Sequence, residues 1–511
     1  MSSANGRQDL SALGVQDLSA LGIQALVDPG KTPTDEQVRV IEAPRRPLLV
    51  VAGAGSGKTE TMSMRVLWLV ANHEDIAPSS VLGLTFTRKA AGELGDRLRQ
   101  RLALLAGRVP SLRERLDEDP VSLTYNSFAE RIVAEHGMRI GIDPDFTMLT
   151  EAGAVDLMTQ IVEGWPTDLD EDLSPSAAVG HCLHLAGEVG EHGYTVEEAR
   201  DALEGFGRDL EQIGATNDTA RKTLRANARR LAYLGPVEEF QRRKREGGLL
   251  DFSDQLVLAT RIVREAPAVR AQVRDEFQAV LLDEFQDTSV IQMELLSLLF
   301  HDHAVTAVGD PNQAIYGWRG ASASSLERFL DRFQDGPAQP GQTLTLSTAW
   351  RNDRNILRAA NRVAAPLREH SRAAKSPVLR ARPGAGEGRV DVAYTQDYRS
   401  ALGAVVDFVS AHRARGTREG KRPTTAVLCR RRSDFPYVDM ALREAGVPTQ
   451  IVGLGGLLDQ PSVQDARAAL VLADDVEASP WLARLLAGID LGAADLVALG
   501  DWARHLAREE G

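Results

Sequence analysis

Short apolar runs alternate with longer stretches of helical spacing over much of this chain. The runs LLVVAG, VLGLTF, AVLLDE, AVTAVGD and TLTLS occupy residues 48–53, 81–86, 279–284, 304–310 and 343–347. Helical spacing follows the first run from Thr59 to about Ala71, and Ala90, Leu94 and Leu98 share one side of a second helix. Short apolar strands that alternate with helices are typical of a parallel sheet covered on both faces. The pattern predicts the α/β class, with these five runs as strands.

This alternation stops between residues 151 and 248, where the chain is acidic and has helical spacing. That change predicts an all-α subdomain inserted into the α/β unit. The Gly/Pro-rich stretch RPGAGEG at residues 382–388 has the composition of a linker. After it, RVDVAY, a helix over residues 398–413, TTAVLC and PTQIVG restore the alternation and predict a second α/β unit.

Length and composition are those of a multidomain globular protein. At 511 residues the chain is too long for one core and predicts roughly three or four compact units. No apolar run approaches the ~20 residues of a membrane span, and the N-terminus lacks the layout of a secretory signal. We therefore expect a cytoplasmic protein with no membrane partner. Cys182 and Cys429 are too few for a disulfide framework.

Charge and histidine patterns narrow the possible partners. The net charge of −13 argues against a continuous basic coat, although a local basic groove remains compatible with it. The basic runs at residues 241–245, 413–422 and 429–432 are more typical of solvated faces than of binding sites. The HCLH stretch at residues 181–184 lacks a second ligand pair at finger-like spacing, which favours helical core and surface over a metal site.

A glycine-rich stretch, AGAGSGKTET, directly follows the first predicted strand and opens a helix. Glycines let backbone N–H groups turn toward phosphate oxygens, and the helix N-terminus adds a favourable partial charge. Lys58 is placed to reach the β- and γ-phosphates and Thr59 to ligate Mg²⁺. A flexible turn alone does not explain a Lys-Thr pair at this position. The predicted nucleotide-binding residues here are Ala52, which replaces the usual first glycine, Gly53, Ala54, Gly55, Ser56, Gly57, Lys58, Thr59 and Glu60.

Two carboxylates end the predicted strand AVLLDE. Asp283 and Glu284 follow four apolar residues, so both are delivered to the edge of the sheet. One carboxylate can hold Mg²⁺ and the other can orient and deprotonate the attacking water. A buried acidic pair without a cation would be costly. Phosphoanhydride hydrolysis is the chemistry that this pair predicts.

The loop after residue 309 mixes residue types that core packing does not require together. Gln313, Tyr316, Trp318 and Arg319 lie within nine residues of the predicted strand end at Asp310. An amide beside two aromatic rings and an arginine predicts a polar sensor next to a stacking platform.

Several stretches occur in the order and at the separations of a known family. They are TPTDEQ, AGAGSGKT, LTFTRKAAGEL, TYNSFA, LLDFSDQL, DEFQDT, GDPNQAIYGWRGA and STAWRNDRNIL. Together they resemble the motifs of the UvrD/PcrA/Rep group of superfamily 1 DNA helicases, from about Thr32 to about Asp465. This resemblance implies a RecA-like P-loop NTPase sheet with an inserted all-α subdomain and a partial second RecA-like domain.

The resemblance implies further nucleotide contacts. Gln37 would contact the adenine edge, and Trp350 would stack on the base. Arg351 looks like the arginine that reaches the γ-phosphate from the boundary of the second α/β unit. Gln286 and Gln313 would sense the γ-phosphate. With Lys58, Asp283 and Glu284, the residues Gln313 and Arg351 complete the implied catalytic set, and Thr59 and Asp283 the implied metal ligands.

It also implies a path for single-stranded DNA. Thr85, Phe86, Arg88, Tyr125 and Asn126 fall where the family's first domain touches the strand. Tyr316, Trp318 and Arg319 would line its base-stacking path, and base–aromatic stacking tolerates any sequence. Two positions depart from the family pattern: Glu60 replaces an arginine, and Asn126 replaces a histidine.

The implied layout has six parts. Residues 1–30 are a lead-in, residues 31–125 and 251–345 form the first RecA-like motor domain, and residues 126–250 form the helical insertion. Residues 346–475 are an incomplete second RecA-like domain, and residues 476–511 begin a further helical insertion. Two late family motifs, one of which supplies an arginine finger, do not occur. We therefore expect the N-terminal part of a longer helicase, or a natural truncation.

The resemblance implies an ATP-dependent DNA helicase and translocase that uses ATP and Mg²⁺. It would move 3′→5′ on single-stranded DNA, act at duplex junctions, and serve DNA repair or recombination. One alternative is the motor subunit of a helicase–nuclease with a partner subunit. Another is a truncated, ATP-gated module that binds single strands without unwinding them.

Overall fold

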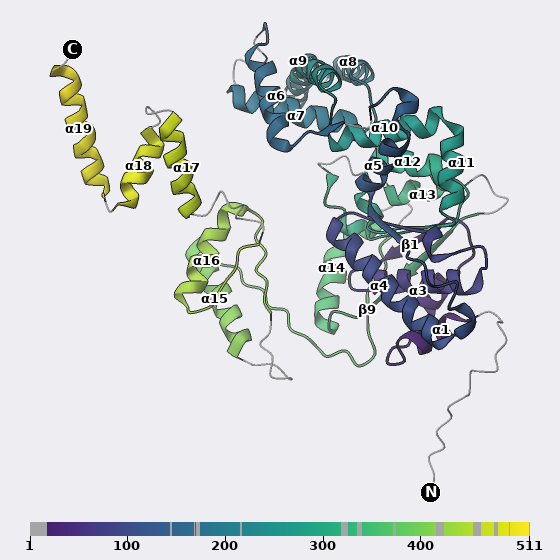
Figure 1. The fold of residues 1–511 in the computed structure, drawn as a ribbon. Helices are drawn as coiled ribbons and strands as arrows, with labels where there is room; N and C mark the ends of the chain where they lie inside the picture. The colour runs from purple at the N-terminus through teal and green to yellow at the C-terminus, as the bar shows by residue number, and fades with distance from the viewer. Residues whose placement is uncertain are drawn as a thin grey trace. The chain divides into compact units, whose positions relative to one another are not determined.

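The computed structural model describes residues 18–143, 146–167, 169, 174–214, 217–317, 325–334, 340–370, 375–414, 424–452, 461–474, 479–489 and 491–509. The chain divides into two compact units, residues 1–390 and 391–511. Figure 1 shows the elements of both. Among the described residues, no helix combines the length and the apolar character needed to cross a membrane.

A six-stranded sheet forms the centre of the first unit. Its strand order is β3-β2-β6-β7-β1-β8, and every neighbouring pair is parallel. The strands are β1 (Leu48–Ala52), β2 (Val81–Thr85), β3 (Val121–Thr124), β6 (Ala279–Leu282), β7 (Val305–Gly309) and β8 (Gln342–Leu346). The α/β class and the five predicted strands are confirmed. The edge strand β3 escaped prediction because its residues are only half-buried and mix polar with apolar types.

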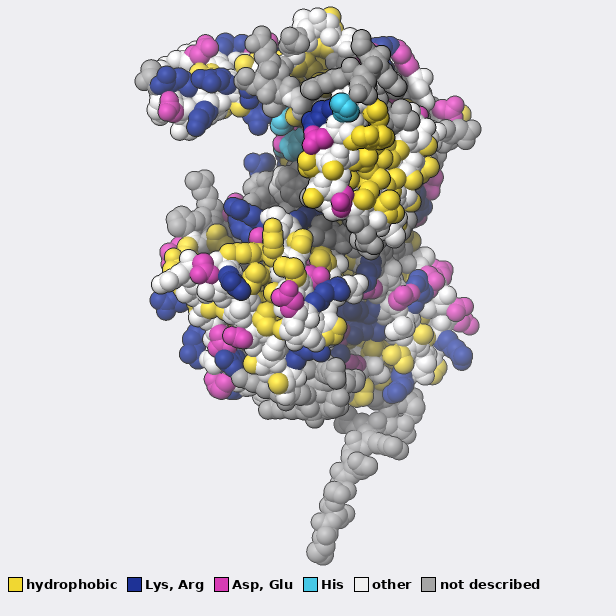
Figure 2. All heavy atoms as spheres, turned by 90° about the vertical axis from the view of Figure 1, so that its left-hand side faces the viewer, with side chains coloured by type: hydrophobic (Ala, Val, Ile, Leu, Met, Phe, Trp, Pro, Cys, Tyr) yellow, Lys and Arg dark blue, Asp and Glu magenta, His cyan; other side chains and the backbone are white. Residues whose placement is uncertain are grey.

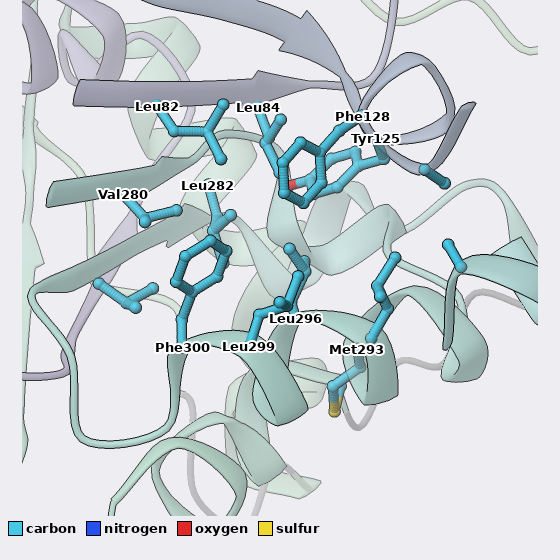
Figure 3. Close-up of a cluster of buried hydrophobic side chains, with 14 of the residues drawn as sticks. Leu82, Leu84, Tyr125, Phe128, Val280, Leu282, Met293, Leu296, Leu299 and Phe300 are labelled. Atoms are coloured by element: carbon cyan, nitrogen blue, oxygen red, sulfur yellow. The ribbon is translucent and has the colours of Figure 1, made fainter. Parts of the chain in front are cut away.

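Side chains of the strands alternate between two buried faces, as a parallel sheet between helical layers requires. One face carries Leu84, Val280 and Leu282, which pack with Phe128 and Phe300 (Figure 3). This face is covered by α5 (Tyr125–His136), α10 (Phe252–Glu265), α11 (Pro267–Glu276), α12 (Val290–Phe300) and α13 (Ser325–Phe333). The other face is covered by α1 (Ala20–Val27), α2 (Asp35–Ile41), α3 (Lys58–Asn72) and α4 (Arg88–Arg108).

A helical subdomain with its own core interrupts the sheet. Its helices are α6 (Glu151–Glu163), α7 (Pro175–Glu191), α8 (Val196–Gln212) and α9 (Asp218–Glu246). The strands β4 (Thr147–Met148) and β5 (Leu249–Leu250) pair with each other where the chain enters and leaves it. Cys182 lies in this core, and His184 is exposed. No cluster of three or more metal-ligating side chains occurs within the described residues.

The first unit ends with β9 (Thr348–Ala349), α14 (Arg354–His370) and β10 (Arg380–Ala381). The second unit contains α15 (Tyr398–Ala414), α16 (Phe435–Glu444), α17 (Pro461–Asp474), α18 (Ser479–Gly488) and α19 (Ala493–Glu509). The predicted helix at residues 398–413 is confirmed as α15. The predicted strands at residues 389–394, 424–429 and 448–453 do not form wherever the structure describes these residues. Val392 and Leu428 are almost fully exposed there.

One buried cation joins the first helices to the sheet. Arg65 in α3 is fully buried and donates to the carbonyls of Val40, Ile41 and Ala43 and to the hydroxyl of Thr306 in β7. Burial lowers the pKa of its guanidinium to about 10, so it stays charged at neutral pH. These residues are buried, and Arg65 supplies their carbonyls with a donor inside the layer on this face.

Replacing Arg65 should therefore destabilise the fold strongly. We expect Arg65→Met to lower the free energy of unfolding by roughly 3–5 kcal/mol, because several buried acceptors lose their donor at once. The control is Arg45→Met, which removes a solvent-exposed pair with Asp75 and should cost below about 1 kcal/mol. Denaturant unfolding followed by circular dichroism measures both. Equal effects would show that the buried guanidinium is not a structural tie.

Candidate nucleotide and DNA site

The glycine-rich loop runs from the end of β1 to the start of α3. Gly55 and Gly57 have φ values of 73° and 82°, in the left-handed region that favours glycine. α3 begins at Lys58, so its unpaired N–H groups face the loop, as in anion-binding helix N-termini. A cavity of ≈ 460 Å³ opens at this point, lined by Ala54, Gly55, Ser56, Gly57, Lys58, Thr59, Glu60, Arg97, Glu284, Gln313, Trp350 and Arg351.

Most of the predicted nucleotide residues therefore gather around one cavity. Ala52 is the buried last residue of β1, and Gly53 follows it beneath the loop. Asp283 stands behind Glu284 at the end of β6. Arg97, from α4, also lines the cavity and was not among the residues predicted from the sequence. A signal was present: Arg97 lies next to the buried Leu94 and Leu98 of that helix, at the border of its apolar stripe.

The acidic pair stands directly opposite Lys58. Nζ of Lys58 lies 2.8 Å from Oε2 of Glu284, whose backbone adopts a left-handed conformation with φ 49°. Such a conformation is uncommon for a residue with a side chain and marks a position held by its surroundings. Burial and the neighbouring Glu284 raise the pKa of Asp283 to about 6, and Lys58 opposes that shift.

A hydrogen-bonded chain continues from this pair into the next strand. Nε2 of Gln286 donates to Oε2 of Glu284 (2.9 Å), and Oε1 of Gln286 accepts from the backbone N–H of Asp310 (3.0 Å). The carboxylate of Asp310 then accepts from Nε2 of Gln313 (2.7 Å). The two glutamines predicted as sensors are thus joined through Asp310 to the Lys58–Glu284 pair.

Gln37, Trp350 and Glu60 surround Gly57 on another side of the cavity. A Cβ placed on Gly57 would lie 3.2 Å from Nε2 of Gln37, 3.7 Å from Cδ1 of Trp350 and 3.9 Å from Cβ of Glu60. The backbone N–H of Trp350 donates to the carbonyl of Gly55 (2.8 Å). Trp350 thus presents a 39% exposed indole at the cavity, whereas the amide of Gln37 is buried and bonded to Thr34 and Thr61. The contact of Gln37 with the adenine edge stays a prediction.

Glu60 does not stand free at this edge. Its carboxylate accepts two hydrogen bonds from Arg101 of α4, at 2.6 and 2.7 Å. Where the family pattern has an arginine, this chain thus has an acid, and that acid is paired with an arginine of another helix. The pair neutralises a negative charge that would otherwise repel phosphates.

The predicted DNA residues lie at the same edge of the sheet, after β2, β3 and β7. The rings of Phe86 and Tyr316 stack with centroids 4.4 Å apart and planes at 30°. Phe86, Arg88 and Asn126 also line a second cavity of ≈ 690 Å³, whose far wall includes His184 and Glu188 of α7. Trp318 and Arg319 lie outside the described residues.

Two predicted DNA residues are buried. Tyr125 is 4% exposed, and its hydroxyl donates to the carbonyl of Asp283 (2.9 Å). Burial raises the pKa of that hydroxyl. Thr85 is 2% exposed and donates to the carbonyl of Thr87. In this conformation a DNA strand lying along this edge of the sheet would contact the residues beside Thr85 and Tyr125. The DNA contacts of these two residues therefore stay predictions.

Basic side chains form no continuous surface on the described part of the face in Figure 2, where Lys and Arg lie among Asp, Glu and apolar groups. Three of the four basic residues in the run at residues 241–245 are paired with nearby carboxylates. Arg242 and Arg243 pair with Glu239, and Lys244 pairs with Asp251 and Asp254. The interpretation of this run as a solvated face stays a prediction.

The donor set fits a magnesium–nucleotide complex. Thr59, in the first turn of α3, and Asp283 offer the hydroxyl and carboxylate oxygens that Mg²⁺ prefers. Lys58 and Arg97 stand beside this acidic pair, and a bound Mg²⁺ would add positive charge where both carboxylates are ionised. The arrangement defines a P-loop nucleotide site at the carboxyl edge of a parallel sheet.

Comparison with known proteins gives the family. The model of the UvrD/REP helicase N-terminal domain matches residues 33–334, and the chain belongs to this family. It is 28% identical over 440 residues to DNA helicase II of Escherichia coli, covering 86% of this chain and 54% of the relative. It is 26% identical to the ATP-dependent DNA helicase PcrA of Staphylococcus epidermidis, covering 85% and 53%. It is 28% identical to the ATP-dependent DNA helicase UvrD2 of Mycobacterium bovis, covering 85% and 57%. The chain spans about half the length of these relatives.

The raised pKa of Asp283 predicts a pH-dependent cost to stability. The folded chain holds this proton more tightly than the unfolded chain, so stability falls as pH rises from about 4 to about 6. Asp283→Asn keeps the size and an acceptor for the N–H of Glu284. It should raise the free energy of unfolding at pH 7.5 by up to about 3 kcal/mol and lose that gain near pH 4.

Thermal unfolding in the absence of nucleotide, measured from pH 4 to 8, tests this expectation. Asp75→Asn is the control, because Arg45 lowers the pKa of Asp75 and the stability from that pair is lost as pH falls. A gain for Asp283→Asn that is equal at pH 4 and pH 7.5 would contradict the burial of an ionised carboxylate.

Proposed function

We propose that this chain is the ATP-binding motor portion of a DNA helicase and translocase that moves on single-stranded DNA. The observation that carries the proposal is the chain of hydrogen bonds from Lys58 through Glu284, Gln286 and Asp310 to Gln313. Tyr316, which stacks on Phe86, follows Gln313 by three residues. A nucleotide site and an aromatic platform therefore share one short loop.

The geometry supports a competition for Lys58. An incoming γ-phosphate would draw the ammonium from Glu284, because a phosphate group carries more charge than one carboxylate. Glu284 would then be free of Lys58 to orient and deprotonate a water molecule, and Gln286 would remain as the side-chain donor to its carboxylate. Mg²⁺, when bound, supplies charge neutralisation at the phosphates.

The same competition supplies a route to the DNA side. Gln286 also holds the backbone of Asp310, and the N–H of Ile315 donates to Asp287 (3.2 Å). Both hydrogen bonds join the turn that carries Gln313 and Tyr316 to the element that carries Glu284. A change at the phosphate would thus move the stacking ring, and with it a bound base.

Polarity and pathway rest on the resemblance alone. We propose 3′→5′ movement, action at duplex junctions, and a role in DNA repair or recombination, since the relatives are DNA helicases by name. The motor subunit of a helicase–nuclease with a partner subunit stays a prediction. The six-part domain layout also stays a prediction.

A second candidate is an ATP-gated module that binds single strands with slow turnover. One observation favours it: no second sheet forms in the described residues of 391–511. An ATP site completed by a second domain would lack part of its transition-state contacts in that case.

ATP hydrolysis distinguishes these candidates. We expect DNA-stimulated turnover in the unchanged chain, and its loss in Lys58→Ala together with nucleotide affinity. Glu284→Gln should retain nucleotide binding and lower turnover about 100-fold or more, because it keeps the site and removes the base. Steady-state phosphate release with and without single-stranded DNA is the measurement, and Lys31→Ala, an exposed lysine paired with Asp28, is the control.

Negligible turnover with intact ATP-dependent DNA binding would favour the second candidate. Failure of the unchanged chain to bind nucleotide would overturn both.

The aromatic pair should contribute to DNA affinity. Phe86→Ala and Tyr316→Ala should each weaken binding of an oligothymidine by about 1–3 kcal/mol, as removal of a stacking ring does. Tyr194→Ala, which removes an exposed ring that stacks on His192 in the helical subdomain, should leave affinity unchanged. Fluorescence anisotropy at fixed salt measures the three. An equal loss in all three would point to a general effect on folding.

A further inference from the structure

A segment outside every predicted motif lies against the nucleotide loop. Residues 375–381, here called the support segment, follow α14 and include β10. A Cβ placed on Gly53 would stand 2.1 Å from Cδ2 of Leu379 and 3.6 Å from Cγ of Pro377. The φ angle of Gly53 lies outside the left-handed region, so its backbone conformation does not by itself require glycine. What requires a glycine at this position is the side chain of Leu379.

The support segment is fixed at Leu379 from the opposite side. Nδ2 of Asn361, in α14, donates to the carbonyl of Leu379 (2.9 Å), and the N–H of Leu379 donates to Oδ1 of Asn361 (2.9 Å). This two-bond clamp satisfies both backbone groups of one residue, as a neighbouring strand would. The next residue, Arg380, lies in β10, which pairs with β9 in a separate two-stranded sheet, and its backbone N–H donates to the carbonyl of Ser347 (2.9 Å).

A second contact reaches the sensor turn. Oγ of Ser376 donates to Oδ1 of Asp310 (3.4 Å), and both side chains are buried. The other carboxylate oxygen of Asp310 holds Gln313. The support segment therefore contacts the phosphate loop at Gly53 and the glutamine-bearing turn at Asp310.

We propose that the support segment positions the phosphate loop for nucleotide binding, with Leu379 and Asn361 as positioning residues. Phosphate affinity depends on several loop N–H groups held at fixed directions. Leu379 closes the space beneath Gly53, and Asn361 prevents Leu379 from withdrawing. This inference rests on the proposed nucleotide-binding function and adds residues from outside its motifs.

A size-exchange experiment tests the contact. Gly53→Ala places a methyl group into Leu379 and should weaken affinity for a fluorescent ADP derivative about tenfold or more, since overpacking displaces the loop. Leu379→Ala, which leaves the loop unsupported, should weaken it several-fold. The double variant Gly53→Ala/Leu379→Ala makes room for the added methyl and should recover to within about threefold of the unchanged chain. Equilibrium titration in the presence of Mg²⁺ measures all four proteins.

Two further variants separate positioning from general stability. Gly235→Ala places a methyl 2.6 Å from the ring of Trp165 in the helical subdomain, and it should lower the melting temperature without changing ADP affinity. Asn361→Leu removes both clamp hydrogen bonds at similar side-chain size. It should weaken ADP binding several-fold at a melting temperature comparable to that of Gly235→Ala.

The outcomes are distinguishable. Absence of ADP binding in the unchanged chain would overturn the proposed function and this inference with it. Normal binding in the unchanged chain, with a double variant as weak as or weaker than the worse single variant, would overturn the inference alone. Loss of affinity in Asn361→Leu no greater than in Gly235→Ala would do the same.

Discussion

The ion pair between Lys58 and Glu284 is the interaction on which the rest of the site depends. The two residues are 226 positions apart in sequence, yet their charged atoms lie 2.8 Å apart. They meet because β1 and β6 are parallel and flank β7, so their carboxyl ends reach the same edge. The left-handed backbone at Glu284 aims its carboxylate back at the phosphate loop. Every other site residue described is placed relative to this pair, either along the hydrogen-bonded chain to Gln313 or around the cavity that Lys58 lines.

The charges of the site are arranged so that it is incomplete by itself. Burial of Asp283 and the charge of the neighbouring Glu284 raise the pKa of Asp283, and Lys58 and Arg97 offset that shift only in part. Asp310 is satisfied by hydrogen bonds, whereas the pair at β6 depends on Lys58. A phosphate group with its counterion would exchange these contacts for stronger ones. Elsewhere at the cavity, Arg101 already neutralises Glu60, so this acid does not add to the repulsion.

The sequence was sufficient for the parts of the fold and site that depend on local pattern. Fully buried strands can be recognised in the sequence as apolar runs, and the glycine-rich loop can be recognised from its residue spacing. Strand β3 has polar and half-buried residues and gives no such pattern. Arg97 reaches the cavity, and Arg101 reaches Glu60, only because α4 packs beside α3. Leu379 reaches Gly53 only after α14 reverses the chain. Such contacts follow from tertiary packing, which single-sequence periodicity cannot express. In the second unit the pattern predicted strands that do not form in the described residues.

The strand order has a consequence for the time course of synthesis. β1 emerges first from the ribosome, but its two neighbours in the sheet are β7 and β8, which begin at Val305 and Gln342. At about 5–20 residues per second, the phosphate loop waits on the order of tens of seconds for a strand beside it. The helical subdomain, closed by β4 and β5, is complete before that and has its own core. The nascent chain therefore exposes the apolar residues of β1 while a finished subdomain already stands downstream, which makes this interval the point at which a chaperone has most to protect.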